Sequence, residues 1–334
     1  MDSALATIIS SFLVTAIASA VLLAVIMRAL PTDFLGAAVT ERSNHTQAAR
    51  QLGGLAIVPA MIASLWIFGP DNGLDLQFLV ATTTAAALLW VTGFFDDRHH
   101  LPESIRLVSQ LLASAIAVYG LGPDFRLLSE FLPYFVERGL LVIALVYFIN
   151  LTNFMDGLDL MVVSGLGIPL ALLAGFSAFG LAALGTGHLA ASIAGGFAGF
   201  AVFNRPKAKV FLGDSGSLPI GLMSGLAFFM VARDISIWAG LVLPLFFIAD
   251  ATSTLLMRLA AGENIFAAHS KHAYQVAKRA GWSVWQVVLS VGALNLVLGV
   301  CALAASQHGP MRIAGILAAL IGVALLLYRF RRAA

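Results

Sequence analysis

The sequence predicts an all-α, polytopic integral membrane protein with about eleven transmembrane helices. Hydrophobic residues make up 60% of its 334 residues and charged residues only 11%, against roughly a quarter in a soluble protein. The mean hydropathy is +0.94. So few polar side chains cannot coat a water-soluble protein of this size, and the composition also excludes a disordered chain, a collagen and a disulfide scaffold.

Eleven apolar runs are long enough to be membrane spans, because a helix needs about 20 apolar residues to cross the hydrocarbon. They are too long and too continuous for barrel strands, which alternate over about ten residues. The loops are short, so residues 1–334 are expected to form one transmembrane domain. The expected spans are residues 4–27, 53–69, 77–95, 104–122, 138–153, 162–179, 187–203, 216–232, 235–257, 284–305 and 311–328.

The distribution of Lys and Arg predicts the orientation of these spans. Fifteen of the 19 basic residues fall at one end of the alternating spans and four at the other. The richer end is expected to be cytoplasmic, with the N-terminus outside and the C-terminus inside. The first run exceeds a signal-peptide core in length, which predicts a retained helix. The predicted cytoplasmic loops are residues 28–52, 96–104, 154–161, 204–215 and 258–283.

Carboxylates gather in these loops and at the span ends beside them. Asp96 and Asp97 end the third span, and acids so near hydrocarbon are costly unless they have a partner or a function. The pair is either a solvated helix end or a site for an ion or a metal-bound phosphate. Adjacent helical side chains point about 100° apart, so both face one cation only if the helix ends there. Crowding raises the proton affinity of one carboxylate, which then suits a general base.

Polar residues recur at every third position from Asn150, at Asn153, Asp156 and Asp159. In a helix they would line one drifting face. A membrane helix avoids such side chains unless they have partners. The segment is therefore either part of a binding site or an inert polar stripe at the membrane interface.

Asp214 lies in a loop of glycines and serines directly before the eighth span. Asp214 or Ser215 can cap that helix, and the same helix N-terminus favours phosphate, so the structural and the functional interpretation are compatible. The preceding Arg205, Lys207 and Lys209 are either topology signals or cations that attract a polyanion.

His269 and His272 are three residues apart in the last predicted cytoplasmic loop. Three interpretations are open: a zinc pair, solvated interfacial side chains, or contacts of an anionic substrate. No Cys accompanies the two histidines, which argues against a structural zinc site.

Three separated acidic segments together offer five carboxylates on one membrane face. Mg²⁺ binds through one or two carboxylates plus substrate phosphates, and phosphoryl transfer needs little beyond a metal, cations and an oriented nucleophile. The sequence has no P-loop and no dinucleotide fingerprint, so an ATPase or a dinucleotide enzyme is not supported. We expect a membrane enzyme with one lipid and one soluble substrate. A cation-coupled secondary transporter is the alternative class, but it would place acids near the bilayer midplane.

Six motifs follow one another in a specific order. They are Glu41-Arg-Ser-Asn-His45 with Arg50 and Gly53-Gly54, Phe94-Phe-Asp-Asp97, Asn153-Phe-Met-Asp-Gly-Leu-Asp159, Asn204 with Phe211-Leu-Gly-Asp214-Ser-Gly-Ser217, Asp250 with Arg258, and Ala268-His-Ser-Lys-His-Ala-Tyr-Gln275. Together they resemble the polyprenyl-phosphate N-acetylhexosamine-1-phosphate transferase family, of the glycosyltransferase family 4 type, over nearly the whole chain.

The resemblance implies a fold of ten or eleven helices and a definite reaction. Undecaprenyl phosphate would attack a UDP-N-acetylhexosamine to give undecaprenyl-diphospho-sugar and UMP, at the cytoplasmic face of a bacterial inner membrane. Mg²⁺ is the implied cofactor, with Mn²⁺ as an alternative, and membrane lipid is an implied partner. Direct in-line attack is expected, a covalent aspartyl-phosphate is left open, and so is a homodimer. The net charge of +2 is too small to indicate nucleic acid.

The same resemblance implies roles for individual residues. Asp96 would be the base that deprotonates the lipid phosphate, and Asp97 and Asp214 would position the metal and the diphosphate, with Asp214 the better candidate for direct coordination. The implied substrate contacts are Asn153, Asp156, Asp159, Asn204 and Phe211 around uridine, His269 and His272 at the diphosphate or sugar phosphate, and His45 and Arg50.

Three departures from the family pattern concern the sugar. Leu160 stands where the family often has glycine, and Leu52 interrupts a common run of three glycines. The last motif differs from the His-x-His-His form common in enzymes that use UDP-GlcNAc. It is similar to the branch that starts O-antigen and related surface polysaccharides, which uses UDP-GlcNAc, UDP-FucNAc or UDP-QuiNAc. The alternative within the family is the phospho-MurNAc-pentapeptide transferase of peptidoglycan synthesis.

Overall fold

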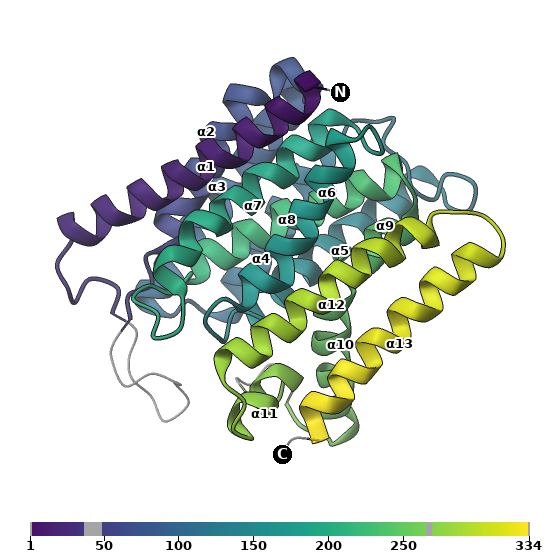
Figure 1. Ribbon diagram of the computed structural model, residues 1–334. Helices are drawn as coiled ribbons and strands as arrows, with labels where there is room; N and C mark the ends of the chain where they lie inside the picture. Colours follow the sequence, from purple (N-terminus) through teal and green to yellow (C-terminus); the bar gives the residue numbers. More distant parts are fainter. Residues whose placement is uncertain (1, 37–48, 265–268, 333–334) are drawn as a thin grey trace.

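The computed structural model describes residues 2–36, 49–264 and 269–332, and these form a helical bundle (Figure 1). The elements are α1 (Asp2–Ala29), α2 (Gly53–Phe68), η1 (Pro70–Asn72), α3 (Leu76–His99), α4 (Glu103–Gly120), α5 (Tyr134–Phe154), η2 (Val163–Gly167), α6 (Ile168–Ala178), α7 (Leu184–Asn204), α8 (Asp214–Asp234), α9 (Ile237–Val242), α10 (Leu245–Ala260), α11 (Ala273–Arg279), α12 (Val284–Ala305) and α13 (Pro310–Arg332).

Each expected span overlaps a helix of the structure, so the predicted fold class is confirmed. Seven helices of the described part are long and apolar enough to cross a membrane, namely α1, α3, α5, α7, α8, α12 and α13. The expected span 235–257 is wrong as a single helix, because it forms α9 and α10 with a break at Leu243 and Pro244. Proline lacks the amide hydrogen and its ring clashes with the carbonyl four residues earlier. At Pro244 the chain ends α9 and begins α10, whereas α2 and α8 continue through Pro59 and Pro219.

Helix α8 lies at the centre of the bundle and packs against α2, α3, α5, α7 and α9. Its most apolar stretch is 89% buried, whereas the corresponding stretches of the peripheral α1 and α13 are 28% and 22% buried. Small residues bring the neighbours close, and a Cβ atom on Gly221 would lie 2.9 Å from the Cα of Ile149 in α5. Such close backbone approach drives helix association in membranes, where burial of apolar surface does not.

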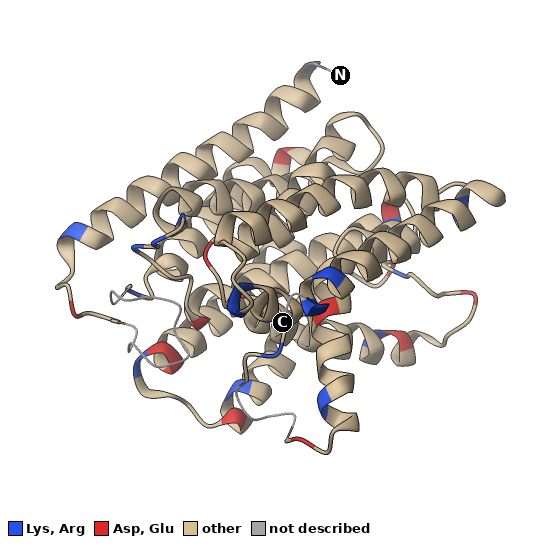
Figure 2. Cartoon of the chain, turned by 60° about the horizontal axis from the view of Figure 1, so that its bottom comes forward, with Lys and Arg blue, Asp and Glu red and all other residues tan. Residues whose placement is uncertain are grey.

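The ends of the bundle differ from its middle in charge. Figure 2 shows Lys, Arg, Asp and Glu mainly at helix ends and in loops, while the long helices carry few charges along their lengths. The first turn of α1 and the last turn of α13 lie at opposite ends of the bundle (Figure 1), as an odd number of crossings requires. Which end faces the cytoplasm stays a prediction.

Candidate active site

Two loops that are distant in sequence pair beside the start of α2. The Phe211 amide donates to the Arg50 carbonyl at 2.9 Å, and the amides of Gly53 and Gly54 donate to the carbonyls of Phe211 and Leu212, each at 2.9 Å. The first amides of a helix have no partner within the helix. The 211–212 segment therefore satisfies α2 and is itself fixed directly before Asp214.

Asp97, near the end of α3, caps the N-terminus of α8. Its Oδ1 accepts the Asp214 amide at 2.7 Å and its Oδ2 accepts the Ser215 amide at 3.0 Å. The prediction that Asp214 or Ser215 caps this helix is therefore wrong. Gly213, at the cap position, has φ +72°, and a Cβ there would lie 2.7 Å from Asp97 Oδ2. Glycine suits this position because it tolerates a positive φ and leaves room for the carboxylate.

The carboxylate of Asp214 then points into a polar cluster. Its Oδ1 accepts a hydrogen bond from Asn153 Nδ2 at 2.7 Å, and its Oδ2 lies 3.7 Å from Arg106 Nη1. Arg106 also donates to Asp96 Oδ2 at 3.1 Å, and Asp96 Oδ1 accepts the Leu101 amide at 2.7 Å. The structure thus brings together Asp96, Asp97, Asp214 and Asn153, four of the predicted site residues.

Asp96 and Asp97 diverge as neighbours on a helix should, because α3 continues to His99. Asp96 turns toward α4, where Arg106 lies, and Asp97 turns toward α8. They nevertheless flank the same third carboxylate, Asp214. The condition that the helix must end at the pair is therefore not needed for both to reach one cluster.

Arg106 is a functional candidate that the structure adds to those predicted from the sequence. It lies in the first turn of α4, only ten residues after Asp96, and a cation placed that close to an acidic pair was the available signal. Its position between Asp96 and Asp214 offsets the repulsion between those two carboxylates. It also leaves guanidinium donors of the type that bind phosphate oxygens.

We expect Arg106→Gln to lower kcat/KM by about 10²-fold, the scale for removal of one preorganised donor. Lysine keeps the charge but not the planar fork, so Arg106→Lys should retain an intermediate activity. The measurement is the initial rate of nucleotide release. Arg312→Gln, at the opposite end of the bundle, is the matched control, and equal losses in both variants would contradict a role for Arg106 at the site.

Asp156 lies in the loop after α5, so the condition that the whole segment is helical is not met and the four polar residues do not share one helical face. α5 ends at Phe154, and Asn150 pairs with Gln110 of α4, its Nδ2 donating to Gln110 Oε1 at 2.7 Å. Asn150 thus acts between helices, as the inert-stripe alternative proposed, while Asn153 belongs to the acidic cluster. Burial raises the pKa of Asp156 well above its usual range, and the negative charges of Asp214, Asp97 and Asp159 raise it further.

Asn204 and Asp159 tie the loop after α5 to the loop after α7. Asn204 Oδ1 accepts the Leu160 amide at 2.7 Å and its Nδ2 donates to the Val210 carbonyl at 2.9 Å. Asp159 Oδ2 accepts the Ala208 amide at 3.3 Å. Leu160 has φ +58°, a left-handed conformation in which glycine carries no penalty, which would account for the glycine that the family resemblance implies here. Asn204 and Asp159, both predicted to contact uridine, therefore form hydrogen bonds that fix the two loops beside the acidic cluster.

Asp250 of α10 positions the start of α11 and with it the two histidines. Its Oδ1 accepts the Ala273 amide at 2.8 Å and its Oδ2 accepts the Tyr274 amide at 3.3 Å. His272 is only 3% exposed, and its ring lies 4.9 Å from that of His269. No zinc-type cluster of three or more ligands occurs among the described residues. The buried His272 also does not fit the solvated alternative, so a substrate contact stays the prediction for the pair.

Burial, followed by the nearby charges of His272, Arg258 and Lys271, lowers the pKa of His269 from 6.5 to about 4. A lowered pKa means that His269 is neutral at every pH well above 4, so it would meet a phosphate as an N–H donor. Because kcat/KM reports the free enzyme, we expect its pH profile to be unchanged between pH 6 and 8 in His269→Asn, even if the rate falls. His308→Asn is the control, and loss of a step near pH 6.5 only in His269→Asn would contradict this.

Three other predicted contacts lie apart from the cluster or outside the described residues. Arg50 is 8% exposed and donates to the carbonyls of Met27, Leu30 and Pro31 at 2.7–3.0 Å, so it caps the end of α1. Its predicted contact with substrate has no geometric support here. Phe211 is half-buried in the paired segment. His45 lies outside the described residues.

The oxygen donors of the cluster fit a divalent cation such as Mg²⁺. Mg²⁺ needs one or two carboxylates and takes its other oxygens from water and substrate phosphates, so the lack of a protein-only group of three ligands in the described part is no obstacle. Both oxygens of Asp97 already accept backbone amides. Asp214 is therefore the better candidate ligand, with Asp97 holding it in place.

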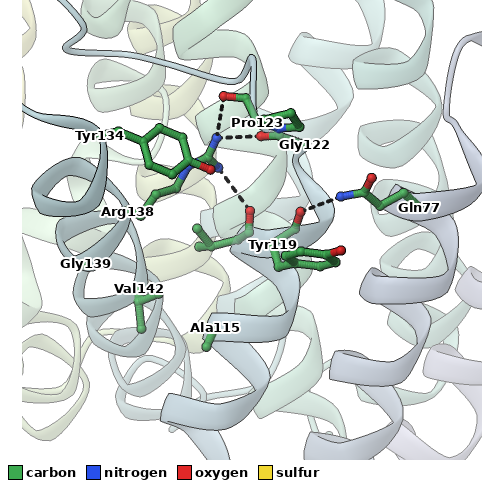
Figure 3. Close-up of a pocket in the computed structure, with 10 residues that line it drawn as sticks. Gln77, Ala115, Tyr119, Gly122, Pro123, Tyr134, Arg138, Gly139 and Val142 are labelled. Atoms are coloured by element: carbon green, nitrogen blue, oxygen red, sulfur yellow. Dashed lines mark hydrogen bonds between the residues drawn. The ribbon is translucent and has the colours of Figure 1, made fainter.

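A separate hollow of about 570 Å³ lies at the opposite end of α4 and α5 (Figure 3). Arg138 is its one charged lining residue, and its guanidinium donates to the carbonyls of Val118, Gly122 and Phe125, with its charge 4.9 Å from the centroid of the Tyr134 ring. These hydrogen bonds indicate that Arg138 stabilises the loop that connects α4 and α5. The hollow offers no chemistry comparable to that of the acidic cluster.

Comparison with known proteins matches the part of the chain that carries the acidic cluster. The family model described as glycosyl transferase family 4 matches residues 79–232, a stretch that includes Asp96, Asp97, Arg106, Asn153 and Asp214. A phospho-N-acetylmuramoyl-pentapeptide-transferase of Listeria monocytogenes serotype 4b is 28% identical over an alignment of 278 residues, with 75% of this chain and 82% of the relative covered. Residues 79–232 thus match glycosyl transferase family 4, the family type that the sequence motifs resemble.

Further relatives of this chain differ in their named substrates. A phospho-N-acetylmuramoyl-pentapeptide-transferase of Enterococcus hirae is 27% identical over 264 residues, covering 74% of this chain and 80% of the relative. A decaprenyl-phosphate N-acetylglucosaminephosphotransferase of Mycolicibacterium smegmatis is 31% identical over 219 residues, covering 59% of this chain and 53% of the relative. The chain is thus a membrane-bound transferase, and its relatives do not single out one sugar.

Proposed function

We propose that this chain transfers N-acetylhexosamine-1-phosphate from a UDP-sugar to undecaprenyl phosphate. An oxygen of the lipid phosphate would form a bond to the sugar-bound phosphorus of the donor. The bond between that phosphorus and the bridging oxygen would break, and UMP would leave with this oxygen. The observation that carries the proposal is the cap that Asp97 makes on α8, because it gathers three carboxylates and Arg106 around one point.

Each residue of the cluster has a place in this reaction. A bound Mg²⁺, held by Asp214 with Asp97 behind it, would neutralise charge on the phosphates. Asp96 would accept the proton of the lipid phosphate, and Arg106 would bind a phosphate oxygen. Asn153 keeps the Asp214 carboxylate in orientation. The loops that carry Asp156, Asp159, Asn204 and Phe211 would hold the nucleotide on the cytoplasmic face of a bacterial inner membrane.

The sugar and the pathway have two candidates. The His-x-x-His form of the last motif favours an N-acetylhexosamine and surface polysaccharide synthesis. The names of the relatives from Listeria and Enterococcus favour the N-acetylmuramoyl-pentapeptide unit, whereas that of the Mycolicibacterium relative favours N-acetylglucosamine. The family match supports either sugar over a cation-coupled transporter.

Release of UMP from a panel of donors tests the proposal. Purified protein would receive undecaprenyl phosphate, Mg²⁺ and one of UDP-GlcNAc, UDP-FucNAc, UDP-QuiNAc or UDP-MurNAc-pentapeptide. Release with a simple N-acetylhexosamine donor is expected, and release with the pentapeptide alone would assign the other sugar. The proposal would be overturned if no donor led to UMP release although a thermal unfolding transition showed that the protein is folded.

Labelled UMP distinguishes the two chemical routes. Direct attack exchanges labelled UMP into the donor only when the lipid acceptor or its product is present. A covalent aspartyl intermediate exchanges it without any lipid. We expect no exchange in the absence of lipid.

A further inference from the structure

The Tyr274 side chain of α11 forms hydrogen bonds to the backbone on both sides of Asp156. Its side chain is fully buried, and its hydroxyl donates to the Phe154 carbonyl at 3.2 Å and accepts the Gly157 amide at 3.1 Å. One phenol can make both bonds at once, because it has one donor and spare acceptor capacity. The two bonded backbone groups stand on either side of Asp156, so a single hydroxyl brackets that residue.

The contact between α11 and this loop leaves no free space. A Cβ atom on Gly157 would lie 2.4 Å from the Tyr274 hydroxyl oxygen and 2.8 Å from Gln275 Nε2. The Phe154 carbonyl belongs to the last turn of α5, where carbonyls lack partners within the helix. Tyr274 therefore fixes the loop both by packing and by completing the end of α5.

α11 is itself held rigidly, so it can act as a reference for the loop. Asp250 is fully buried and accepts the amides of Ala273 and Tyr274. Thr254 Oγ1 also donates to Asp250 at 3.2 Å, and Arg331 of α13 lies 3.7 Å from the same carboxylate. A continuous path of hydrogen bonds thus runs from α10 through Tyr274 to both sides of Asp156.

We propose that Tyr274 is a positioning residue for nucleotide binding, which acts by holding Asp156 in place. This inference rests on the proposed function, in which Asp156 contacts the nucleotide. Burial, with the negative charges of Asp250 and Asp156, raises the pKa of Tyr274 above its ordinary value of 10. The hydroxyl therefore keeps its proton and both bonds at any pH at which the protein works.

Tyr274→Phe removes the hydroxyl and keeps the ring in its packing. We expect the KM for the UDP-sugar to rise about tenfold, while kcat and the KM for undecaprenyl phosphate change less than twofold. The Kd of UMP, measured by calorimetry, should rise by the same factor. Tyr147→Phe is the matched control, because the Tyr147 hydroxyl also bridges two helices, lying 2.7 Å from Thr252 Oγ1, and it should leave all these values unchanged.

A double-mutant cycle shows whether Tyr274 acts through Asp156. Adding Tyr274→Phe to Asp156→Asn should raise the Kd of UMP no further. Gly157→Ala, which forces the loop away from α11, should give the same KM pattern and serves if Tyr274→Phe does not fold. Unchanged KM for the UDP-sugar, equal loss for both substrates, or additive effects in the cycle would each overturn the inference. Absence of UMP release by the unmodified protein would instead overturn the proposed function.

Discussion

Asp214→Asn should abolish UMP release and leave the protein folded. Asparagine keeps an oxygen that accepts the Asn153 hydrogen bond, which is 2.7 Å long in the structure, and it does not disturb the backbone amides that Asp97 caps. It removes the negative charge that faces Arg106. If that charge holds the cation of the reaction, its removal costs several kcal/mol, or about 10³-fold in rate.

The control for this prediction is Asp124→Asn, which removes one exposed carboxylate at the opposite end of the bundle. Both variants change the net charge equally, so only a local role of Asp214 separates them. The measurements are UMP release and the midpoint of thermal unfolding. Activity within tenfold of the unmodified protein in Asp214→Asn would remove Asp214 from its assigned role.

Composition and hydropathy are sufficient to predict the fold class and the approximate positions of the helices, because a helix in lipid must be long, apolar and hydrogen-bonded within itself. The same argument could not foresee the break between α9 and α10, since a proline inside an apolar run is tolerated where neighbours satisfy the freed backbone groups. At Pro244 the chain instead ends one helix and begins another. Local pattern alone does not distinguish the two outcomes.

The caps that build the candidate site come from distant segments, and a local pattern cannot predict them. Asp97 caps α8 across 117 positions, and Asp250 caps α11 across 23. At the other end of the bundle, Asp234 accepts the Ala183 amide at 3.0 Å and the Thr186 hydroxyl, and so caps α7. The acids were recognisable as unusual in sequence, but the helix N-terminus that each one serves depends on tertiary packing.

The residue types of the site were predictable, whereas their division of labour was not. Asp96, Asp97, Asn153 and Asp214 lie together, as the sequence predicts. The three-residue spacing groups Asn150 with them, but Asn150 bonds to Gln110. α5 ends four residues after Asn150, so the period of a helix stops applying within the motif. The sequence does not distinguish Arg106 from a topology signal, because a single arginine at a predicted cytoplasmic helix start is also what orientation alone would place there.

Gly93→Ala should disable the enzyme from a position that carries no functional group. A Cβ atom on Gly93 of α3 would lie 2.3 Å from the backbone carbon and oxygen of Asp214. Backbone atoms at a helix start cannot rotate away as a side-chain tip can, so α8 must move relative to α3. Overpacking of this kind typically costs about 1–3 kcal/mol in stability. A displacement of about 1 Å at a reacting centre can cost on the order of 10²-fold in rate.

Gly175→Ala is the matched control, because Gly175 is also a helical glycine but has nothing within 4 Å of its added Cβ. We expect Gly175→Ala to keep full activity and thermal stability, and Gly93→Ala to lose at least 10²-fold in UMP release with a lower unfolding midpoint. The Asp97 cap spans the same contact between α3 and α8, so the two helices cannot separate without breaking it. Full activity in Gly93→Ala would mean that the reaction tolerates a displacement of α8. The hydrogen bonds from the start of α8 to Asp97 would then not be what positions Asp214 for the reaction.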